Sequence, residues 1–364
     1  MRRKNYFLCA ILLGLSLSIM AETKIVTSVS DLSAALANAS YDVIELGSDI
    51  SDVTDLTISR SLTLDLKGYT LTTTSPASGT PMVFTISGEN VTFQSTGADH
   101  KGQIITRGQH IATLYITAGT TNVDNIAFEK TRRNANIYYA QGSEGGSVTN
   151  CAFSVEGNHS GGGIHCGSGS NKQVYITDCT ANITYSDDQA EWSVACVQVA
   201  NKTTAIVENC SFVSVAPCFA ICNTGGYLTI KSGTYSSSLR GGNPHYTGVI
   251  CLDGRTNAQA NVTIEGGEFD GEMSMFAAGN QANNLMTVEV GTIFSDDPSE
   301  APFTMTIHGV VRLTDEGKYI VEQDGPVTRS HAVSVHGAAH KCWSNGQLVI
   351  YKNGVHYNAL GAQL

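Results

Sequence analysis

One short phrase recurs along this chain at intervals of 23 to 31 residues. It reads Val148-Thr149-Asn150-Cys151-Ala152-Phe153, and close copies occupy residues 123–128, 176–179 and 207–212. Weaker copies follow at residues 230–235 and 264–269. The turn position of the phrase is held by Asn125, Asn150, Asp178, Asn209 and Ser232. A period of this size, built from β-branched and turn residues, indicates a solenoid of stacked strands.

A second series of cysteines keeps a similar period. Cys166, Cys196, Cys222 and Cys251 lie 30, 26 and 29 residues apart. Each follows the turn position of the phrase at a comparable distance. Two columns with one period predict at least three strands per coil: one that ends at the Asn or Asp, one that starts at the following Cys, and one that carries Ile164-His165-Cys166 or its equivalent.

The asparagine column explains how such coils would turn. Asparagine tolerates left-handed dihedral angles, and its amide can hydrogen-bond the asparagine of the next coil. Because the alternation of the strand reverses at that turn, Val148, Cys151 and Phe153 can all point inward. We therefore predict an all-β fold: a single right-handed parallel β-helix with a short N-terminal helical cap and a small C-terminal β-hairpin.

These residues resemble the pectin-lyase-like superfamily of parallel β-helix proteins over residues 28–312. The composition agrees, with 41% hydrophobic residues, 37 glycines and only 15% charged residues. The resemblance implies that a substrate would lie across one strand face flanked by long loops. The acidic and basic sets expected of a pectate lyase or a polygalacturonase are not found at that strand, so the resemblance is to the fold.

The N-terminus predicts export. Arg2, Arg3 and Lys4 precede an apolar stretch from Tyr6 to Met20, and Ala21 suits a cleavage site. The stretch is shorter than the roughly 20 residues of a membrane span, so we expect no transmembrane segment after cleavage. Loss of three basic residues takes the formal net charge from −11 to −14. That charge disfavours nucleic acid as a partner.

Nine cysteines remain after residue 21, which is an odd number. Export favours disulfides, but stacked side chains that point the same way rarely reach disulfide geometry. We expect reduced, buried thiols that act as small hydrophobes. No C-x-x-C spacing occurs, so a zinc site is not predicted.

The two ends of the solenoid have their own signals. Ser30-Asp31 can begin a helix that buries Leu32, Ala35 and Leu36, followed by a strand over 42–46. We place the β-helix at 22–322, a linker at 323–340 and a tail at 341–364. In the tail, two strands flank Asn353-Gly354, a pair suited to a type I′ hairpin. The tail resembles those of bacterial type IX secretion substrates, and a simple capping hairpin is the alternative.

Candidate site residues lie on the strand at 164–166 and on the loops that lead into it. His165 points outward if Ile164 and Cys166 point inward, and its predicted counterparts are Ala195, Ile221 and Ile250. Weak catalytic candidates are His165, Asp187, Asp188 and Glu191. Candidate ligand-binding residues are Trp192, Arg240, His245 and Tyr246. No cofactor is predicted, although the loop carboxylates could bind calcium.

We therefore expect an exported, monomeric protein, extracellular or at the cell surface with the periplasm as the alternative. It would present its solenoid surface to an extracellular polysaccharide or a cell-surface glycan. Two alternatives stay open. One is a polysaccharide lyase or glycoside hydrolase, and the other is a structural or adhesive solenoid without glycan binding.

Overall fold

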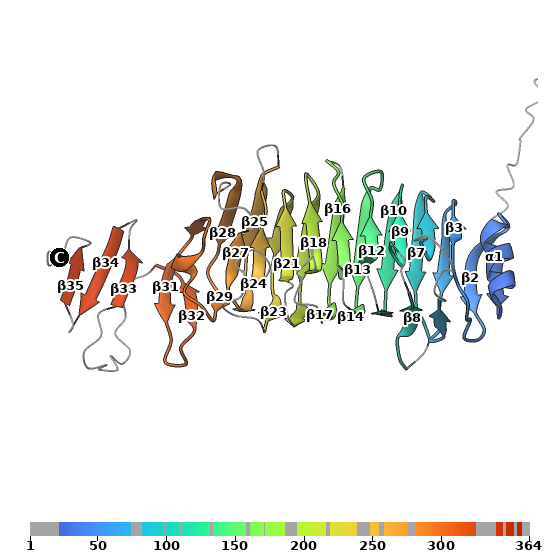
Figure 1. Ribbon diagram of the computed structural model, residues 1–364, viewed down its shortest axis with the longest axis horizontal. Coiled ribbons are helices and arrows are strands. Elements are labelled where there is room, and N and C mark those ends of the chain that lie inside the picture. The colour runs from blue at the N-terminus through green and yellow to red at the C-terminus, as the bar shows by residue number, and fades with distance from the viewer. Residues whose placement is uncertain are drawn as a thin grey trace, which may run out of the picture.

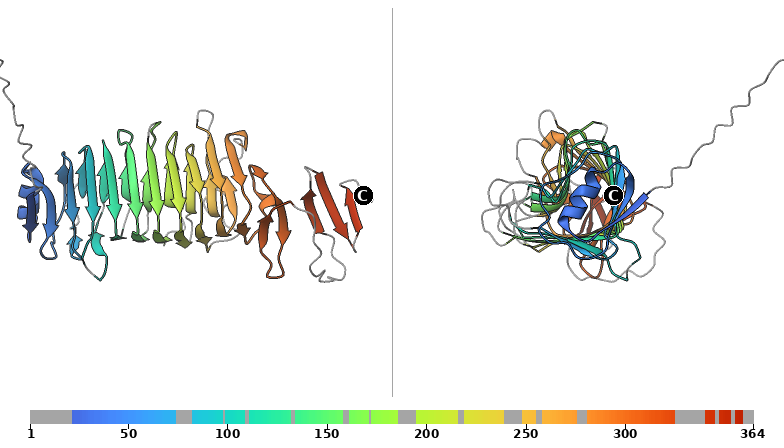
Figure 2. Two further views of the ribbon diagram at one scale, coloured as in Figure 1. Left: turned by 180° about the vertical axis from the view of Figure 1, so that it is seen from behind. Right: turned by 90° about the vertical axis from the view of Figure 1, so that its right-hand side faces the viewer.

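The computed structural model describes residues 22–73, 82–97, 99–108, 111–131, 134–157, 161–170, 172–185, 195–215, 219–238, 248–254, 258–275, 281–324, 340–344, 347–352 and 355–358. Over residues 22–324 the chain forms a right-handed parallel β-solenoid (Figure 1). Seen end on, its coils superpose around one core, and helix α1 (Val29–Ala37) lies across the N-terminal end (Figure 2). The predicted fold is confirmed.

Three sheets, named A, B and C here, form the walls of the solenoid. Within the described residues sheet A has twelve strands, all parallel. They are β1 (Glu22–Val26), β2 (Tyr41–Leu46), β4 (Leu62–Asp65), β7 (Asn90–Gln94), β10 (Thr120–Asp124), β13 (Gly145–Thr149), β16 (Gln173–Thr177), β19 (Thr204–Glu208), β22 (Tyr227–Ile230), β25 (Ala260–Ile264), β28 (Asn284–Val288) and β30 (Thr304–Ile307).

Sheet B follows sheet A after the turn at one corner of each coil. Its parallel strands are β5 (Thr70–Thr72), β8 (Gly102–Thr106), β11 (Ile126–Lys130), β14 (Ala152–Gly157), β17 (Thr180–Tyr185), β20 (Cys210–Val215), β23 (Gly233–Ser237), β26 (Gly267–Asp270) and β29 (Thr292–Phe294). An antiparallel hairpin, β31 (Val310–Leu313) and β32 (Tyr319–Glu322), closes this sheet against β29. Two short 3-10 helices, η1 (Gln281–Asn283) and η2 (Pro298–Glu300), lie in the last coils.

Sheet C completes each coil. Its strands are β3 (Leu56–Ile58), β6 (Phe84–Ile86), β9 (Leu114–Ile116), β12 (Asn134–Tyr139), β15 (Gly161–Cys166), β18 (Ala195–Ala200), β21 (Phe219–Thr224), β24 (Gly248–Leu252) and β27 (Met273–Met275). The connections from sheet B to sheet C contain most of the internal residues outside the described set, such as 186–194 and 239–247.

The turn from sheet A to sheet B forms as predicted. Asn125, Asn150, Asp178 and Asn209 have φ angles of 56°, 51°, 55° and 51°, all left-handed. The Asn150 amide donates to Asn125 Oδ1 over 3.1 Å, and the Asn209 amide donates to Asp178 Oδ1. In the next coil the predicted turn residue, Ser232, is not left-handed. The positive φ angles of the later coils are at Gly233 (130°) and Gly267 (115°), and Gly233 pairs with Cys210, one position after the asparagine column. The column therefore combines a required backbone conformation with side-chain bonds between coils.

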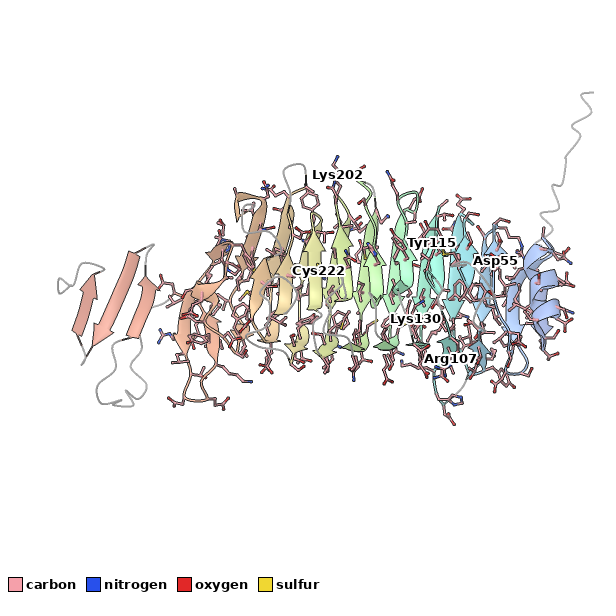
Figure 3. All side chains as sticks on the ribbon, viewed as in Figure 1. Asp55, Arg107, Tyr115, Lys130, Lys202 and Cys222 are labelled. Carbon is pink, nitrogen blue, oxygen red and sulfur yellow. The ribbon has the colours of Figure 1, made fainter. Side chains whose placement is uncertain are left out.

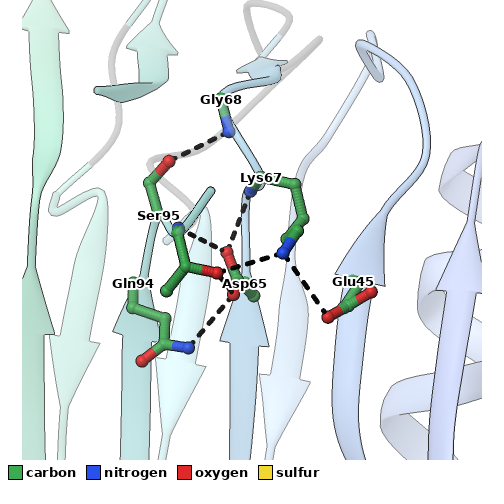
Figure 4. A network of polar contacts seen from close by, with 7 residues as sticks. Glu45, Asp65, Lys67, Gly68, Gln94 and Ser95 are labelled. Atoms are coloured by element: carbon green, nitrogen blue, oxygen red, sulfur yellow. Dashed lines mark hydrogen bonds and ion pairs between the residues drawn. The ribbon is translucent and has the colours of Figure 1, made fainter. Parts of the chain in front are cut away.

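The first coils use a different polar network at the same corner (Figure 4). Asp65 Oδ1 accepts hydrogen bonds from the backbone amides of Lys67 (2.9 Å) and Thr96 (3.0 Å). Ser95 Oγ accepts from the amides of Gly68 and Gly102, each over 2.9 Å. Because buried backbone donors need partners, this network takes the structural role that the asparagines have later.

The core is a continuous stack of apolar side chains along the solenoid axis. Val148, Cys151 and Phe153 are at most 3% exposed, as predicted. In sheet B the rings of Phe128 and Phe153 are stacked with centroids 5.2 Å apart. One charged residue, Lys130, is fully buried on the inner side of β11 (Figure 3), and burial lowers its pKa to about 7.

The predicted N-terminal helix and C-terminal hairpin are both present, and each end has one additional strand. Helix α1 begins at Val29, with Ser28 rather than Ser30 as its N-cap, and buries Leu32, Ala35 and Leu36. Strand β1 pairs with β2 ahead of the expected first strand. The C-terminal hairpin forms from β34 (Gln347–Lys352) and β35 (Val355–Asn358), and β33 (His340–Ser344) adds an antiparallel third strand. The tail is thus a three-stranded sheet, while the linker and sorting predictions remain predictions.

Candidate functional site

One column of side chains runs along the outer face of sheet C. The strand register places His165 beside Tyr138 on one side and Gln198 on the other. The whole column consists of Thr57, Thr85, Tyr115, Tyr138, His165, Gln198, Cys222, Cys251 and Ser274. We call it the sheet C column. Strands in a sheet lie ~4.8 Å apart, so neighbouring side chains in the column contact one another.

After Thr57 and Thr85, the column continues with three partly exposed rings, Tyr115, Tyr138 and His165, which we call its aromatic half. The rings of Tyr115 and Tyr138 meet edge to face with centroids 5.3 Å apart and a 69° interplanar angle. The Tyr138 ring and the His165 imidazole are stacked, with centroids 4.4 Å apart and 13° between the planes. Gly167 leaves room for the Tyr138 ring, because a Cβ at this position would lie 2.8 Å from a ring carbon. Backbone and neighbours together fix the orientation of these rings.

The aromatic half carries no charge at neutral pH. Burial, with a smaller contribution from nearby Lys172, lowers the pKa of His165 to about 4. Burial and then Tyr115 raise the pKa of the Tyr138 hydroxyl. An imidazole with such a low pKa is a weak general base at neutral pH. The three rings are therefore better suited to stacking and neutral hydrogen bonding than to proton transfer.

Lys172 stabilises the turns that follow β12 and β15. Its ammonium donates to the carbonyl oxygens of Tyr139 and Gly167, each over 2.8 Å, and also to that of Ala140. The side chain is 2% exposed, and burial lowers its pKa to about 8. These bonds link Tyr139 and Gly167 of neighbouring coils, one and two residues beyond Tyr138 and His165, so we interpret Lys172 as a positioning residue.

The second half of the column is buried. Gln198 is 9% exposed, Cys222 3% and Cys251 0%. Cys222 and Cys251 pack with Ala195 in a cluster separate from the main core, consistent with their place on the outer face. Figure 3 shows Tyr115 and Cys222 over the same sheet. A hydrogen bond with Cys251, followed by burial, raises the pKa of the Cys222 thiol well above its usual value, so this thiol is a poor nucleophile.

The predicted counterparts of His165 are wrong. Ala195, Ile221 and Ile250 do not align with His165. Ile164 pairs with Val197, Val197 pairs with Ile221, and Ile221 pairs with Ile250, so Ile221 and Ile250 belong to the column of Ile164. Cys166 accordingly pairs with Val199, and only Cys222 and Cys251 are direct neighbours among the second cysteine series. The inward aliphatic residue sets the register, and the cysteine stands at the same offset from it only in the last two coils, at Cys222 and Cys251.

The first cysteine series is a true column inside the core. Cys151, Cys179 and Cys210 are at most 2% exposed, and their thiols lie 3.2–3.3 Å from the carbonyl oxygens of Thr149, Thr177 and Glu208. The seven cysteines that the structure describes in side-chain detail are all reduced thiols that form no disulfide. The prediction of buried thiols is confirmed for this set.

All of the loop candidates lie outside the described residues. This applies to Asp187, Asp188, Glu191, Trp192, Arg240, His245 and Tyr246. In sequence they stand on the connections that enter β18 and β24. Among the residues that the structure does describe, no group of three or more His, Cys, Asp or Glu side chains could hold a metal ion. The calcium prediction, which concerns the loops, stays a prediction.

No family model, curated protein or solved structure matches this chain. The fold assignment therefore rests on the strand pairing itself. Over the described ranges, no helix is long and apolar enough to cross a membrane.

The sequence-based search missed Tyr115, Tyr138 and Gln198. Tyr115 had a usable signal, because it stands between two inward residues of a recognised strand, Leu114 and Ile116. Tyr138 lies in Ile137-Tyr138-Tyr139, where both tyrosines are candidates for either face. Tyr139 turns inward and donates to the Thr121 carbonyl oxygen over 3.0 Å, while Tyr138 turns outward.

Proposed function

We propose that this chain is an exported β-solenoid protein that binds carbohydrate on the outer face of sheet C, either in the extracellular space or at the cell surface. The basic start and apolar stretch of residues 2–20 support export. The aromatic half of the sheet C column supports carbohydrate binding. The periplasm is the alternative location.

The observation that carries this proposal is the stack of Tyr115, Tyr138 and His165. Aromatic rings supply a rigid, amphipathic contact surface at low cost in conformational entropy. The C–H face of a pyranose ring is apolar, and its hydroxyl groups need hydrogen-bond partners at the rim. The tyrosine hydroxyls and the neutral imidazole can provide such partners without burying a charge.

The connections into sheet C could add contacts to the same ligand. Trp192 and Tyr246 would supply further rings, while Arg240 and His245 would supply hydrogen-bond donors. Because these residues precede β18 and β24, each stands in a coil whose strand contributes to the sheet C column. Their participation is part of the proposal and is tested with it.

A glycan array and a polysaccharide-depolymerisation screen on residues 22–364, with and without calcium, test this function. A matched pair of variants assigns the surface: Tyr138→Ala removes the centre of the stack, and Tyr69→Ala removes an exposed tyrosine (37%) elsewhere. We expect Tyr138→Ala to weaken binding at least tenfold and Tyr69→Ala to leave it unchanged.

The other outcomes are informative as well. New reducing ends or unsaturated products would establish an enzyme and direct attention to Asp187, Asp188 and Glu191. Binding that is insensitive to Tyr138→Ala would overturn the assignment to sheet C. Absence of both binding and turnover from a folded sample would favour the structural or adhesive solenoid.

A further inference from the structure

The outer face of sheet A carries a second group of exposed rings. Tyr175 on β16 and Tyr227 on β22 are 45% and 53% exposed, among the most exposed large hydrophobic side chains of the described residues. Ile206 on β19, which is partly exposed, lies between them. We call these three residues the tyrosine stripe.

The strand register fixes the geometry of the stripe. Tyr175 pairs with Ile206, and Ile206 pairs with Thr229, two residues after Tyr227 on the same strand. Residues two apart on a strand share a face, so all three side chains point outward. Two strand spacings and two residues of strand rise place the tyrosine Cα atoms roughly 12 Å apart. The stripe therefore runs diagonally over three coils, a span that several sugar rings of an extended chain cover.

Uncharged polar residues surround the stripe. On β13, β16, β19, β22, β25 and β28, the two central outward columns of sheet A contain no charged side chain. They consist of Gly145, Gln173, Thr204, Tyr227, Asn261 and Leu285 in one column, and Ser147, Tyr175, Ile206, Thr229, Thr263 and Thr287 in the other. Charges such as Glu208 and Lys231 stand at the corner toward sheet B, where they pair over 3.0 Å.

This distribution indicates the chemistry of a ligand. The chain has a formal net charge of −11, whereas the two outward columns around the stripe carry no charged side chain. A polyanion would gain nothing here and would be repelled by the protein as a whole. Among the described residues, none hydrogen-bonds to the hydroxyl of Tyr175 or Tyr227, so both remain available to a ligand.

We propose that the tyrosine stripe is a second binding surface, which takes an uncharged, extended polysaccharide. Tyr175 and Tyr227 would stack on sugar rings, with Ile206 in apolar contact between them. Gln173, Thr204 and Asn261 would supply neutral hydrogen-bond donors and acceptors beside the rings. The proposal rests on sheet A alone and does not depend on the sheet C column.

Affinity electrophoresis of residues 22–364 tests this surface. Hydroxyethylcellulose and galactomannan serve as uncharged probes, and polygalacturonate serves as the charged probe. We expect the uncharged polymers to retard the wild-type protein. The double variant Tyr175→Ala/Tyr227→Ala should lose at least tenfold in affinity, whereas Tyr69→Ala should behave as wild type. Circular dichroism and the melting temperature verify that each variant is folded, which we expect because the replaced rings are exposed.

A third variant, Tyr138→Ala, separates this proposal from the one on sheet C. Loss of affinity in the double variant with retention in Tyr138→Ala supports the stripe even if sheet C binds nothing. Three results would overturn it: no retardation of wild type by either uncharged polymer, equal affinity in wild type and the double variant, or retardation by polygalacturonate alone. Sedimentation velocity tests one further alternative. If wild type is a dimer and the double variant is a monomer, the stripe binds a second copy of the chain instead of a polysaccharide.

Discussion

The imidazole of His165 lies parallel to the ring of Tyr138 on the neighbouring strand, with 4.4 Å between the ring centroids. The stack holds the imidazole against the sheet, where it loses much of its contact with water. That loss is the main reason that the pKa of His165 falls to about 4. Structure and titration are thus linked at the centre of the candidate site.

The first prediction concerns stability in acid. Because the pKa of His165 is lower in the folded state than its unfolded value of about 6.5, the unfolded chain binds more protons between the two values. Stability is therefore complete above pH 6.5 and falls as the pH drops toward 4. At pH 5 we expect this histidine to cost at most about 2 kcal/mol. Urea unfolding of wild type and His165→Gln at pH 7 and pH 5 measures this contribution. If both proteins lose the same stability between the two pH values, the loss does not come from His165.

The asparagine column allows the turn conformation and the ladder bond to be separated. Asn150 has a φ of 51° and donates to Asn125 Oδ1. Asn150→Ala should cost about 2–3 kcal/mol, because it adds left-handed strain to the lost hydrogen bond. Asn150→Gly removes the two side-chain hydrogen bonds, to Asn125 Oδ1 and from Lys101 Nζ, without left-handed strain, and should cost about 1 kcal/mol. Urea unfolding decides, and equal costs would mean that backbone strain contributes nothing.

Lys172 should be worth far more than an exposed lysine. Lys172→Met removes a charged donor from the carbonyl oxygens of Tyr139, Ala140 and Gly167. Each of these oxygens keeps a neutral donor, from Gly167, Ser143 and Thr203 respectively. A hydrogen bond to a charged group contributes about 1.5–3 kcal/mol, so loss of these three should cost roughly 3 kcal/mol or more. The control is Lys231→Met, which breaks only an exposed ion pair with Glu208 and should change stability by less than about 1 kcal/mol. Thermal and urea unfolding should agree, and similar losses in the two variants would refute a special role for Lys172.

The repeating turn made the architecture predictable, whereas the site was harder to predict. Asn125, Asn150, Asp178 and Asn209 mark one corner because only a few residue types accept left-handed dihedral angles. Sheet C has no such marker, since connections of unequal length precede its strands. The register there depends on which aliphatic residue turns inward. Reading Cys166 and Cys196 as equivalent therefore shifted the outward column and replaced Gln198 and Cys222 by Ala195 and Ile221.

Lys130 shows a further limit of the sequence. In Ile126-Ala127-Phe128-Glu129-Lys130 the alternation does place residue 130 inward with Phe128, yet a lysine at the end of a strand would ordinarily be assigned to the surface. Of its two neighbours in the inner column, the repeated phrase aligns Val155 with Lys130 but does not align Thr106. Only the register reveals that the ammonium group is inside.

Burial of Lys130 predicts a second pH dependence of stability, in an alkaline range rather than the acidic range of His165. Its pKa is about 7 in the folded protein against an unfolded value of about 10.4. The unfolded chain binds more protons between these values, so stability should rise as the pH increases from 7 toward 10. Lys130→Met should flatten that rise in urea unfolding at pH 7 and pH 9.5. A rise of the same size in wild type and variant would assign the effect to other groups, with Lys172 the first to examine because its pKa is lowered as well.

The thiols of Cys222 and Cys251 in the sheet C column should not react with alkylating reagents in the folded protein. Cys222 and Cys251 are at most 3% exposed, and a hydrogen bond with Cys251, followed by burial, raises the pKa of the Cys222 thiol. Alkylation requires the thiolate and access to it. Iodoacetamide at pH 8 should therefore leave both cysteines unmodified in native protein and modify both in urea, as peptide mass mapping would measure. Cys151, Cys179 and Cys210 are the internal control, because they lie in the core proper and should react only on unfolding. Rapid native labelling of Cys222 and Cys251 alone would show that the outer face of sheet C opens in solution, and the buried half of the column would then have to be counted as accessible to ligands.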